Sequence, residues 1–218
     1  MDTLGNRLHV NLLVYSHWFM SIRIYQMKYH SISVDQARYA VSIVAKYLYT
    51  SKVKVSTKFY NTTSPDYMIS TKEDVSTSDE QVEKLNRELN IHYRSCIGSL
   101  IYLLSIIVDL SFAVHKLEKI SENPGKVHFE VLIHILRYIR ENKTLGLKYY
   151  ADINDAPVTD VLRQASIKSE NHLMSFSCSI WQDCPDTGRS TGAYILFYQG
   201  GPIDHGTHVP GPVYQSSA

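Results

Sequence analysis

The segment 93–139 most constrains the fold, because it carries three successive helical patterns separated by helix-breaking residues. Its first part, 93–107, is apolar nearly all round, which predicts a buried helix. Asp109 is then predicted to cap a second helix, whose apolar residues recur at a 3.6-residue period. A Pro-Gly pair at 124–125 ends that helix, and a third follows with its apolar residues on one face. The centre of the chain is therefore predicted to be a helical bundle.

Strands are predicted on both sides of this helical centre. Aromatic and β-branched residues favour a strand at 18–25 and a second, shorter one at 32–34, after which Asp35 can cap a helix. Further strand-like runs lie at 145–150, 172–179 and 191–198, the last two being joined by a turn-rich segment at 183–188, and one more short run follows 200–202. Glu80 to Leu89 is predicted to be a short helix. The predicted fold class is α+β.

The charge balance excludes a protein that is held to nucleic acid by bulk charge, since 22 basic residues face 21 acidic ones among 218 residues. The segment 112–150 is different, because seven basic residues oppose four acidic ones there. An ordinary solvated face of amphipathic helices is the alternative interpretation of this excess. The candidate nucleic-acid-binding residues are Lys116, Lys119, Lys126, Arg137, Arg140, Lys143 and Lys148.

Cysteine content and hydropathy favour an intracellular protein. Cys96, Cys178 and Cys184 are an odd and sparse set, which does not indicate a disulfide scaffold. The first twenty residues lack the pattern of a secretory signal peptide. The most apolar stretch, 95–108, is fourteen residues long, whereas crossing a bilayer takes about 20. We therefore expect a cytoplasmic or nuclear protein without membrane contact, and the sequence identifies no protein partner.

Several phrases resemble, in the same order, the Pol polyproteins of copia-type retrotransposons. Residues 93–103 read YRSCIGSLIYL, which is similar to the family's YRSxIGSLxYL, and 188–194 read GRSTGAY, which resembles its RRSTSGY. Shorter matches lie at 18–21, 35–39, 109–114, 128–138, 145–147, 200–203 and 215–218. No single phrase is decisive, but their collinear order from about Trp18 to the last residue makes the match specific.

This resemblance implies the end of a reverse transcriptase followed by the start of a ribonuclease H. The expected fold has short palm-end strands and a helix, a thumb-like helical bundle, and then an incomplete RNase H-like β-sheet. The implied divisions are an uncertain N-terminal segment (1–17), the palm end (18–50), a linker with a short helix (51–90), the thumb-like region (91–150), a connection (151–170) and a truncated RNase H-like domain (171–218).

The resemblance also implies which catalytic groups this chain lacks. The parent polymerase and ribonuclease each use two Mg²⁺ ions held by carboxylates. The sequence contains no Asp-Asp pair, and the family's first ribonuclease H aspartate is replaced by Cys178 in the phrase FSCSIW. The next carboxylate would follow Ala218, and at 107–109 the chain reads Ile-Val-Asp where the family has Arg-Pro-Asp. We therefore expect no catalytic residue, no metal ligand and no cofactor in this chain.

Three functional hypotheses follow from the resemblance. The chain is a non-catalytic remnant, or a residual module that binds RNA–DNA hybrid or other nucleic acid weakly through its basic helices, or a piece of an enzyme whose other parts are encoded nearby.

Two local alternatives concern the cysteines and the last residues. A zinc site made by Cys178, Cys184, His205 and His208 is disfavoured by its spacing, and Cys178 is predicted to be a buried strand residue. The turn interpretation of 183–188 is preferred over an acidic site. We also expect 171–218 to be loosely held, with an exposed edge and an uncovered apolar face.

Overall fold

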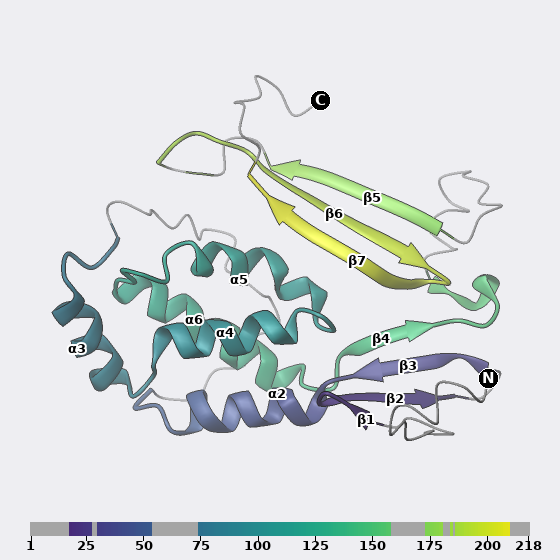
Figure 1. The fold of residues 1–218 in the computed structure, drawn as a ribbon, viewed down its shortest axis with the longest axis horizontal. Helices are drawn as coiled ribbons and strands as arrows, with labels where there is room; N and C mark the ends of the chain where they lie inside the picture. The colour runs from purple at the N-terminus through teal and green to yellow at the C-terminus, as the bar shows by residue number, and fades with distance from the viewer. Residues whose placement is uncertain are drawn as a thin grey trace, which may run out of the picture.

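The computed structural model describes residues 18–27, 30–53, 74–157, 173–180, 184 and 186–209. They form helices and two antiparallel sheets, so the predicted α+β class is confirmed. The first sheet has the order β1-β2-β3-β4 and the second the order β5-β6-β7. Figure 1 shows the helices beside the first sheet, with the second sheet above both. The predictions for 1–17, and those for much of the linker and the connection, lie outside the described residues.

A β-hairpin occupies the place of the single strand predicted at 18–25. Strand β1 (Trp18–Phe19) pairs antiparallel with β2 (Ile22–Gln26). Met20 and Ser21 form the turn between them with φ angles of 47° and 65°. A two-residue turn of this hand matches the twist of the strands, but it is normally marked by Asn or Gly. Neither residue type is present, so the sequence pattern gave no sign of the turn.

Strand β4 (Gly146–Tyr149) follows the helices and returns to the first sheet. It pairs there with β3 (Ile32–Asp35), whose other neighbour is β2. Ile32 lies opposite Tyr149, and Asp35 lies opposite Gly146. This pairing joins the predicted palm end directly to the end of the predicted thumb-like region.

The helices follow the predicted order, with differences at their ends. They are α2 (Ala37–Ile43) continued by a π-helical turn η2 (Val44–Tyr49), α3 (Asp79–Leu89), α4 (Tyr93–Leu103), a 3-10 turn η3 (Val108–Leu110), α5 (Ser111–Glu118), α6 (Lys126–Glu141) and a 3-10 turn η4 (Ile153–Asp155). Helix α3 begins at Ser78, whose side chain accepts the N–H of Gln81, and ends at the left-handed Asn90. No helix in the described part of the chain is long and apolar enough to cross a bilayer.

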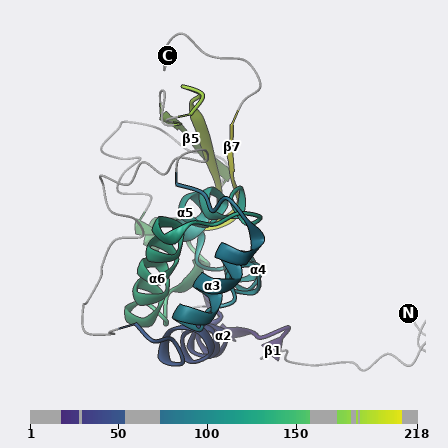
Figure 2. The same cartoon turned by 90° about the vertical axis from the view of Figure 1, so that its left-hand side faces the viewer.

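The hydrophobic core lies among α2, η2, α4, α5 and α6. The apolar face predicted for the third central helix is buried throughout: Phe129, Leu132, Ile133, Leu136 and Ile139. Phe129 packs against Tyr93 of α4, with ring centroids 4.9 Å apart. Tyr47 is buried, while Tyr39 and Tyr102 are half-buried and meet edge to face at 5.1 Å. Figure 2 shows α2 on one side of this bundle and α5 on the other.

Asp109 does not cap the second central helix. Helix α4 ends at Leu103, earlier than the predicted 107, and Asp109 lies within η3. Helix α5 starts at Ser111 with Leu110 in the N-cap position. The Asp109 carboxylate instead accepts a hydrogen bond from the Tyr138 hydroxyl of α6. The Asp109 carboxylate therefore accepts from a side chain on a distant helix, and not from a backbone N–H in the first turn of α5.

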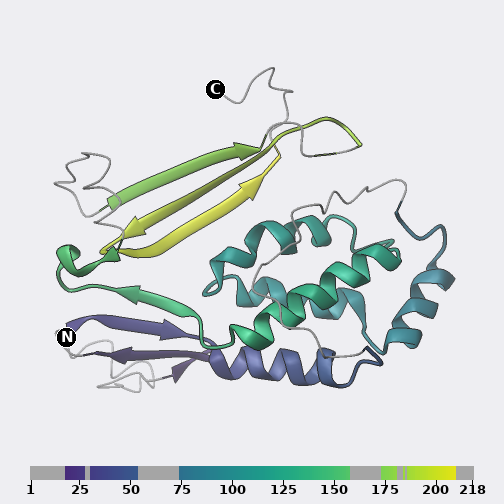
Figure 3. The same cartoon turned by 180° about the vertical axis from the view of Figure 1, so that it is seen from behind.

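The second sheet attaches to the rest of the molecule along one edge strand. Strands β5 (Leu173–Ile180), β6 (Thr191–Tyr198) and β7 (Gly201–His208) are antiparallel. At one end of β7, the Tyr149 hydroxyl donates to the carbonyl of Pro202 over 2.8 Å. At the other end, the hydroxyls of Ser111 and Thr207 share a hydrogen bond of 3.1 Å. Figure 3 shows β7 as the strand of this sheet that is nearest to β4 and α5.

Candidate nucleic-acid interface

The seven basic residues predicted to bind nucleic acid are distributed over several elements. Lys116 lies on α5, Lys126 begins α6 and Lys148 lies on β4. Lys126 and Arg140 are fourteen residues apart on one helix, which corresponds to about 21 Å at 1.5 Å per residue. A single compact ligand group cannot contact all seven, but a nucleic-acid backbone is long enough to follow them.

Two of these residues, Arg137 and Arg140, are largely engaged within the fold. The Arg140 guanidinium lies 2.7 Å from the Glu141 carboxylate, and its side chain is mostly covered. Arg137 is half-buried, and burial together with the neighbouring Arg140 charge lowers the pKa of its guanidinium. Both arginines are therefore less available to a phosphate than their position on the polar face of α6 indicates.

The lysines divide into two groups by exposure. Lys116 is half-buried, with its ammonium 4.8 Å from the Phe112 ring centre, and Lys148 lies 4.4 Å from the ring centre of Tyr150. Such cation–π contacts hold a side chain close to the surface. Lys119, Lys126 and Lys143 are exposed. These three are the best-placed members of the predicted set for contacts with a phosphate backbone.

The β1–β2 hairpin is a basic and aromatic surface that the sequence analysis did not identify. Trp18, Phe19 and Met20 are 41%, 61% and 66% exposed. The Arg38 guanidinium lies 4.5 Å from the Trp18 ring centre, and that of Arg23 lies 4.9 Å from the Tyr25 ring centre. Exposed aromatic rings beside arginines are typical of surfaces that stack on single-stranded bases. Residues 18–25 carry three aromatic residues and Arg23, a composition that fits an ordinary strand equally well, and Arg38 comes from the separate element α2.

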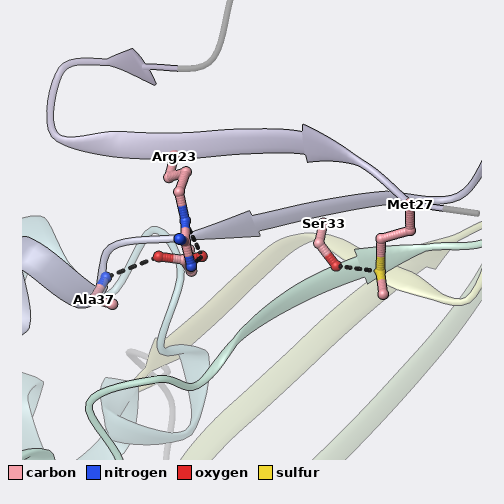
Figure 4. A network of polar contacts seen from close by, with 5 residues as sticks. Arg23, Met27, Ser33 and Ala37 are labelled. Atoms are coloured by element: carbon pink, nitrogen blue, oxygen red, sulfur yellow. Dashed lines mark hydrogen bonds and ion pairs between the residues drawn. The ribbon is translucent and has the colours of Figure 1, made fainter.

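Asp35 fixes this hairpin to helix α2. Its carboxylate accepts hydrogen bonds from Nε and Nη2 of Arg23, at 2.9 and 2.6 Å, and from the backbone N–H of Ala37, at 3.1 Å (Figure 4). Asp35 is buried, and its hydrogen bonds and its negative charge raise the pKa of the Arg23 guanidinium. The formal N-cap of α2 is Gln36, one residue later than predicted, although Asp35 still satisfies the first helical N–H. A Ser33 to Met27 hydrogen bond of 3.1 Å, also drawn in Figure 4, connects the far end of β2 to β3.

Cys178, at the position of the family's ribonuclease H aspartate, is exposed rather than buried. It lies on β5, whose only described neighbour in the sheet is β6, and its partner across that pairing is the small residue Ala193. Little side-chain volume is therefore available to cover it.

No metal site forms around the cysteines in the described part of the chain. There, no group of three or more His, Cys, Asp or Glu side chains could hold a metal ion. Cys178, Cys184, His205 and His208 are all among these residues, so they do not converge on a zinc site.

The predicted turn before β6 is partly described. The N–H of Gly188 donates to the carbonyl of Cys184 over 2.9 Å, and the N–H of Cys184 donates to the carbonyl of Arg189 over 3.1 Å. Gly188 has a φ of 61°, as such a turn requires. Asp183 and Pro185 lie outside the described residues.

Comparison with known proteins finds retrotransposon polyproteins among the sequences similar to this chain. It is 24% identical over 217 residues, which is 100% of this chain, to the retrovirus-related Pol polyprotein from transposon RE1 of Arabidopsis thaliana. It is 26% identical over 170 residues, 73% of the chain, to the corresponding polyprotein from transposon RE2 of the same plant. The aligned regions span only 13% and 11% of these two polyproteins. The predicted resemblance to retrotransposon Pol polyproteins is thereby confirmed, at low identity.

A further relative has a different name. The secreted RxLR effector protein 161 of Plasmopara viticola is 27% identical over 113 residues, covering 51% of this chain and 68% of that protein. No family model and no solved structure matches the chain.

Proposed function

We propose that this chain, which is similar to transposon Pol polyproteins, is a non-catalytic part of a copia-type polyprotein. In this proposal it comprises the end of a reverse transcriptase palm, the thumb-like helices and the opening strands of a ribonuclease H. The observation that carries the proposal is Cys178, an exposed thiol with no surrounding carboxylate cluster among the described residues. A thiol is a poor ligand for Mg²⁺, which prefers oxygen.

The order of the structural elements supports the same assignment. The chain passes from a small antiparallel sheet and a helix, through a bundle, to three antiparallel strands. This is the order that the resemblance implies for a palm end, a thumb-like region and the start of an RNase H-like sheet. The pairing of β4 with β3 supports treating the two segments as one unit.

Activity assays test whether these residues act as an enzyme by themselves. We expect neither Mg²⁺-dependent primer extension nor hydrolysis of the RNA strand of an RNA–DNA hybrid above the buffer rate. A Cys178→Asp variant should remain inactive, because one carboxylate cannot hold two metal ions. Hybrid hydrolysis by the unmodified chain that disappears in a Cys178→Ala variant would contradict the proposal.

A second candidate function is the binding of RNA–DNA hybrid by the basic helical region. It is favoured by the excess of basic over acidic residues in 112–150 and by the exposure of Lys119, Lys126 and Lys143. The arginine-bearing hairpin adds a surface on which unpaired bases could stack. Binding of this kind is electrostatic, so its affinity must fall as salt concentration rises.

A titration at several salt concentrations tests this second function. Each lost phosphate contact lowers the slope of log affinity against log salt by about 0.7–0.9. Replacing Lys119, Lys126 and Lys143 by Gln should therefore reduce the slope by roughly 2–3. Lys84→Gln is the matched control, because Lys84 lies on α3 and is already near Glu88. Absence of any salt-dependent affinity for hybrid would exclude this function while leaving the first proposal intact.

A further inference from the structure

The contact between α5 and β7 is a narrow seam that holds the second sheet to the helical bundle. The Ser111–Thr207 hydrogen bond crosses it. Beside this bond lies a cavity of about 250 Å³, which is lined mostly by apolar groups such as Phe112, Phe176 and Ile195. Among the described residues the seam therefore combines this hydrogen bond with incomplete apolar packing, so its stability depends strongly on the few polar groups within it.

The two elements that form this seam each carry a histidine, His115 on α5 and His205 on β7. His115 lies one helical turn after Ser111, and its Nδ1 is 2.7 Å from the carbonyl oxygen of Ser111. His205 lies two residues before Thr207 on β7, on the same face of that strand, and lines the cavity. The charge of His115 acts on His205. Burial lowers the pKa of His205 most, Asp204 opposes this effect, and His115 lowers the pKa further.

The other titratable and charged groups around His205 come from every neighbouring element. Asp204 precedes it on β7, but one of its carboxylate oxygens accepts the Tyr194 hydroxyl and the other accepts the backbone N–H of His205. Asp109 on η3 and Cys178 on β5 line the same cavity, and the Lys116 ammonium lies over the ring of Phe112, another lining residue. The Asp109 carboxylate already accepts the Tyr138 hydroxyl. The nearby carboxylates are thus engaged by other partners.

We propose that this seam is an acid-sensitive contact, in which protonation of His205 opposite His115 releases the sheet β5–β7 from the helical bundle. A charged imidazole in the partly apolar seam loses its solvation and faces the other histidine across the gap. Release of the sheet lets water reach both imidazoles. Tyr149 contacts Pro202 at the start of β7, and Tyr150 contacts Gln199 in the turn before it. Both contacts use backbone carbonyls and no acid-titrating group, so they remain as a hinge at that end of the strand.

The direction of the pH dependence follows from the lowered pKa of His205. An unfolded histidine takes up its proton near pH 6.5, whereas His205 in the closed seam takes it up at lower pH. The open form therefore binds more protons between these two values. The seam is fully stable above about pH 6.5 and loses stability as the pH falls through the lowered pKa of His205.

Hydrogen exchange at pH 7.5 and 5.0, with rates normalised to those of unstructured peptides, tests this proposal on the full chain. We expect peptides from β6 and β7 to lose about tenfold or more of their protection at the lower pH, while α6 keeps its own. His205→Gln should remove this difference, and His115→Gln should reduce it. His30→Gln, in the exposed loop between β2 and β3, is the matched control and should behave as the unmodified chain.

Two outcomes would overturn the proposal. One is an equal loss of protection in β7 and α6, which would indicate global acid unfolding rather than release of the sheet. The other is an NMR titration of the unmodified chain in which His205 protonates at or above pH 6.5, and this measurement remains decisive if a histidine variant fails to fold.

Discussion

Tyr138 is the residue at which two distant parts of the bundle are tied together. Its hydroxyl donates to the Asp109 carboxylate, which links α6 to the turn before α5. Burial, and the hydrogen bond with the charge of Asp109, raise the pKa of Tyr138 above its ordinary value of 10.0. The neutral phenol is therefore the form that the fold requires.

Tyr138→Phe should lower the free energy of unfolding by about 1 kcal/mol at neutral pH, because the hydrogen bond is lost while the ring remains. The unfolded chain releases the Tyr138 proton near pH 10 and the folded chain at higher pH. Unfolding free energy should thus fall as the pH rises above 10, and less steeply in the Phe variant. Urea unfolding at pH 7 and 10.5 measures both effects. Tyr49→Phe, at a side chain that is 60% exposed, should change neither.

Asp109 and Cys178 show where single-residue prediction from the sequence stops. An aspartate before an apolar helix fits an N-cap, but a tyrosine 29 residues further along the chain competes for its carboxylate. A cysteine in a strand-like run fits a core position, but burial depends on what covers it, and Cys178 lies opposite the small residue Ala193. Both outcomes depend on tertiary partners, which local pattern does not contain.

At the scale of elements, the regular patterns were reliable and the connections between them were not. The period of α6 and the run that forms β6 were predictable because one buried face or one strand-length run determines each. The β1–β2 turn was missed because Met20 and Ser21 adopt a conformation that glycine or asparagine usually supplies. The β3–β4 pairing joins strands separated by the whole bundle, and no local signal specifies it.

Two glycines allow opposite predictions about their elements. A Cβ at Gly98 in α4 would meet no atom within 4 Å, whereas one at Gly201 in β7 would lie 2.6 Å from a ring carbon of Tyr149 and 2.7 Å from the carbonyl oxygen of Lys148. Gly98→Ala should stabilise the fold by about 0.5–1 kcal/mol through helix propensity. Gly201→Ala should destabilise it, because β7 must move away from β4. Thermal unfolding of both variants measures this, and a lower melting temperature for Gly98→Ala would contradict the first part.

At the scale of the whole molecule, burial is concentrated in the helical bundle. Within the described residues, the core cluster is drawn from α2 to α6 and the segments between them, and it includes no residue of β5–β7. Met174 is the one buried hydrophobic side chain described on those three strands, while Leu173, Tyr198 and Ile203 are exposed. The sheet is thus held mainly by its own ladder and by the edge contacts of β7. The bundle and the sheet should consequently differ in their opening free energies.

Hydrogen exchange at pH 7.5 should therefore show the highest protection in α4 and α6 and much lower protection in β5–β7. Leu132→Ala, at a fully buried position, should cost about 2–5 kcal/mol of unfolding free energy and reduce the protection of α6 by the same amount. Phe176→Ala, at a side chain that is 38% exposed, should leave α6 unchanged and affect only the strands. Exchange from β5 at residues 174–176 and from β6 at residues 194–197 at the global unfolding rate would contradict this, since it would mean that the sheet opens only when the bundle unfolds.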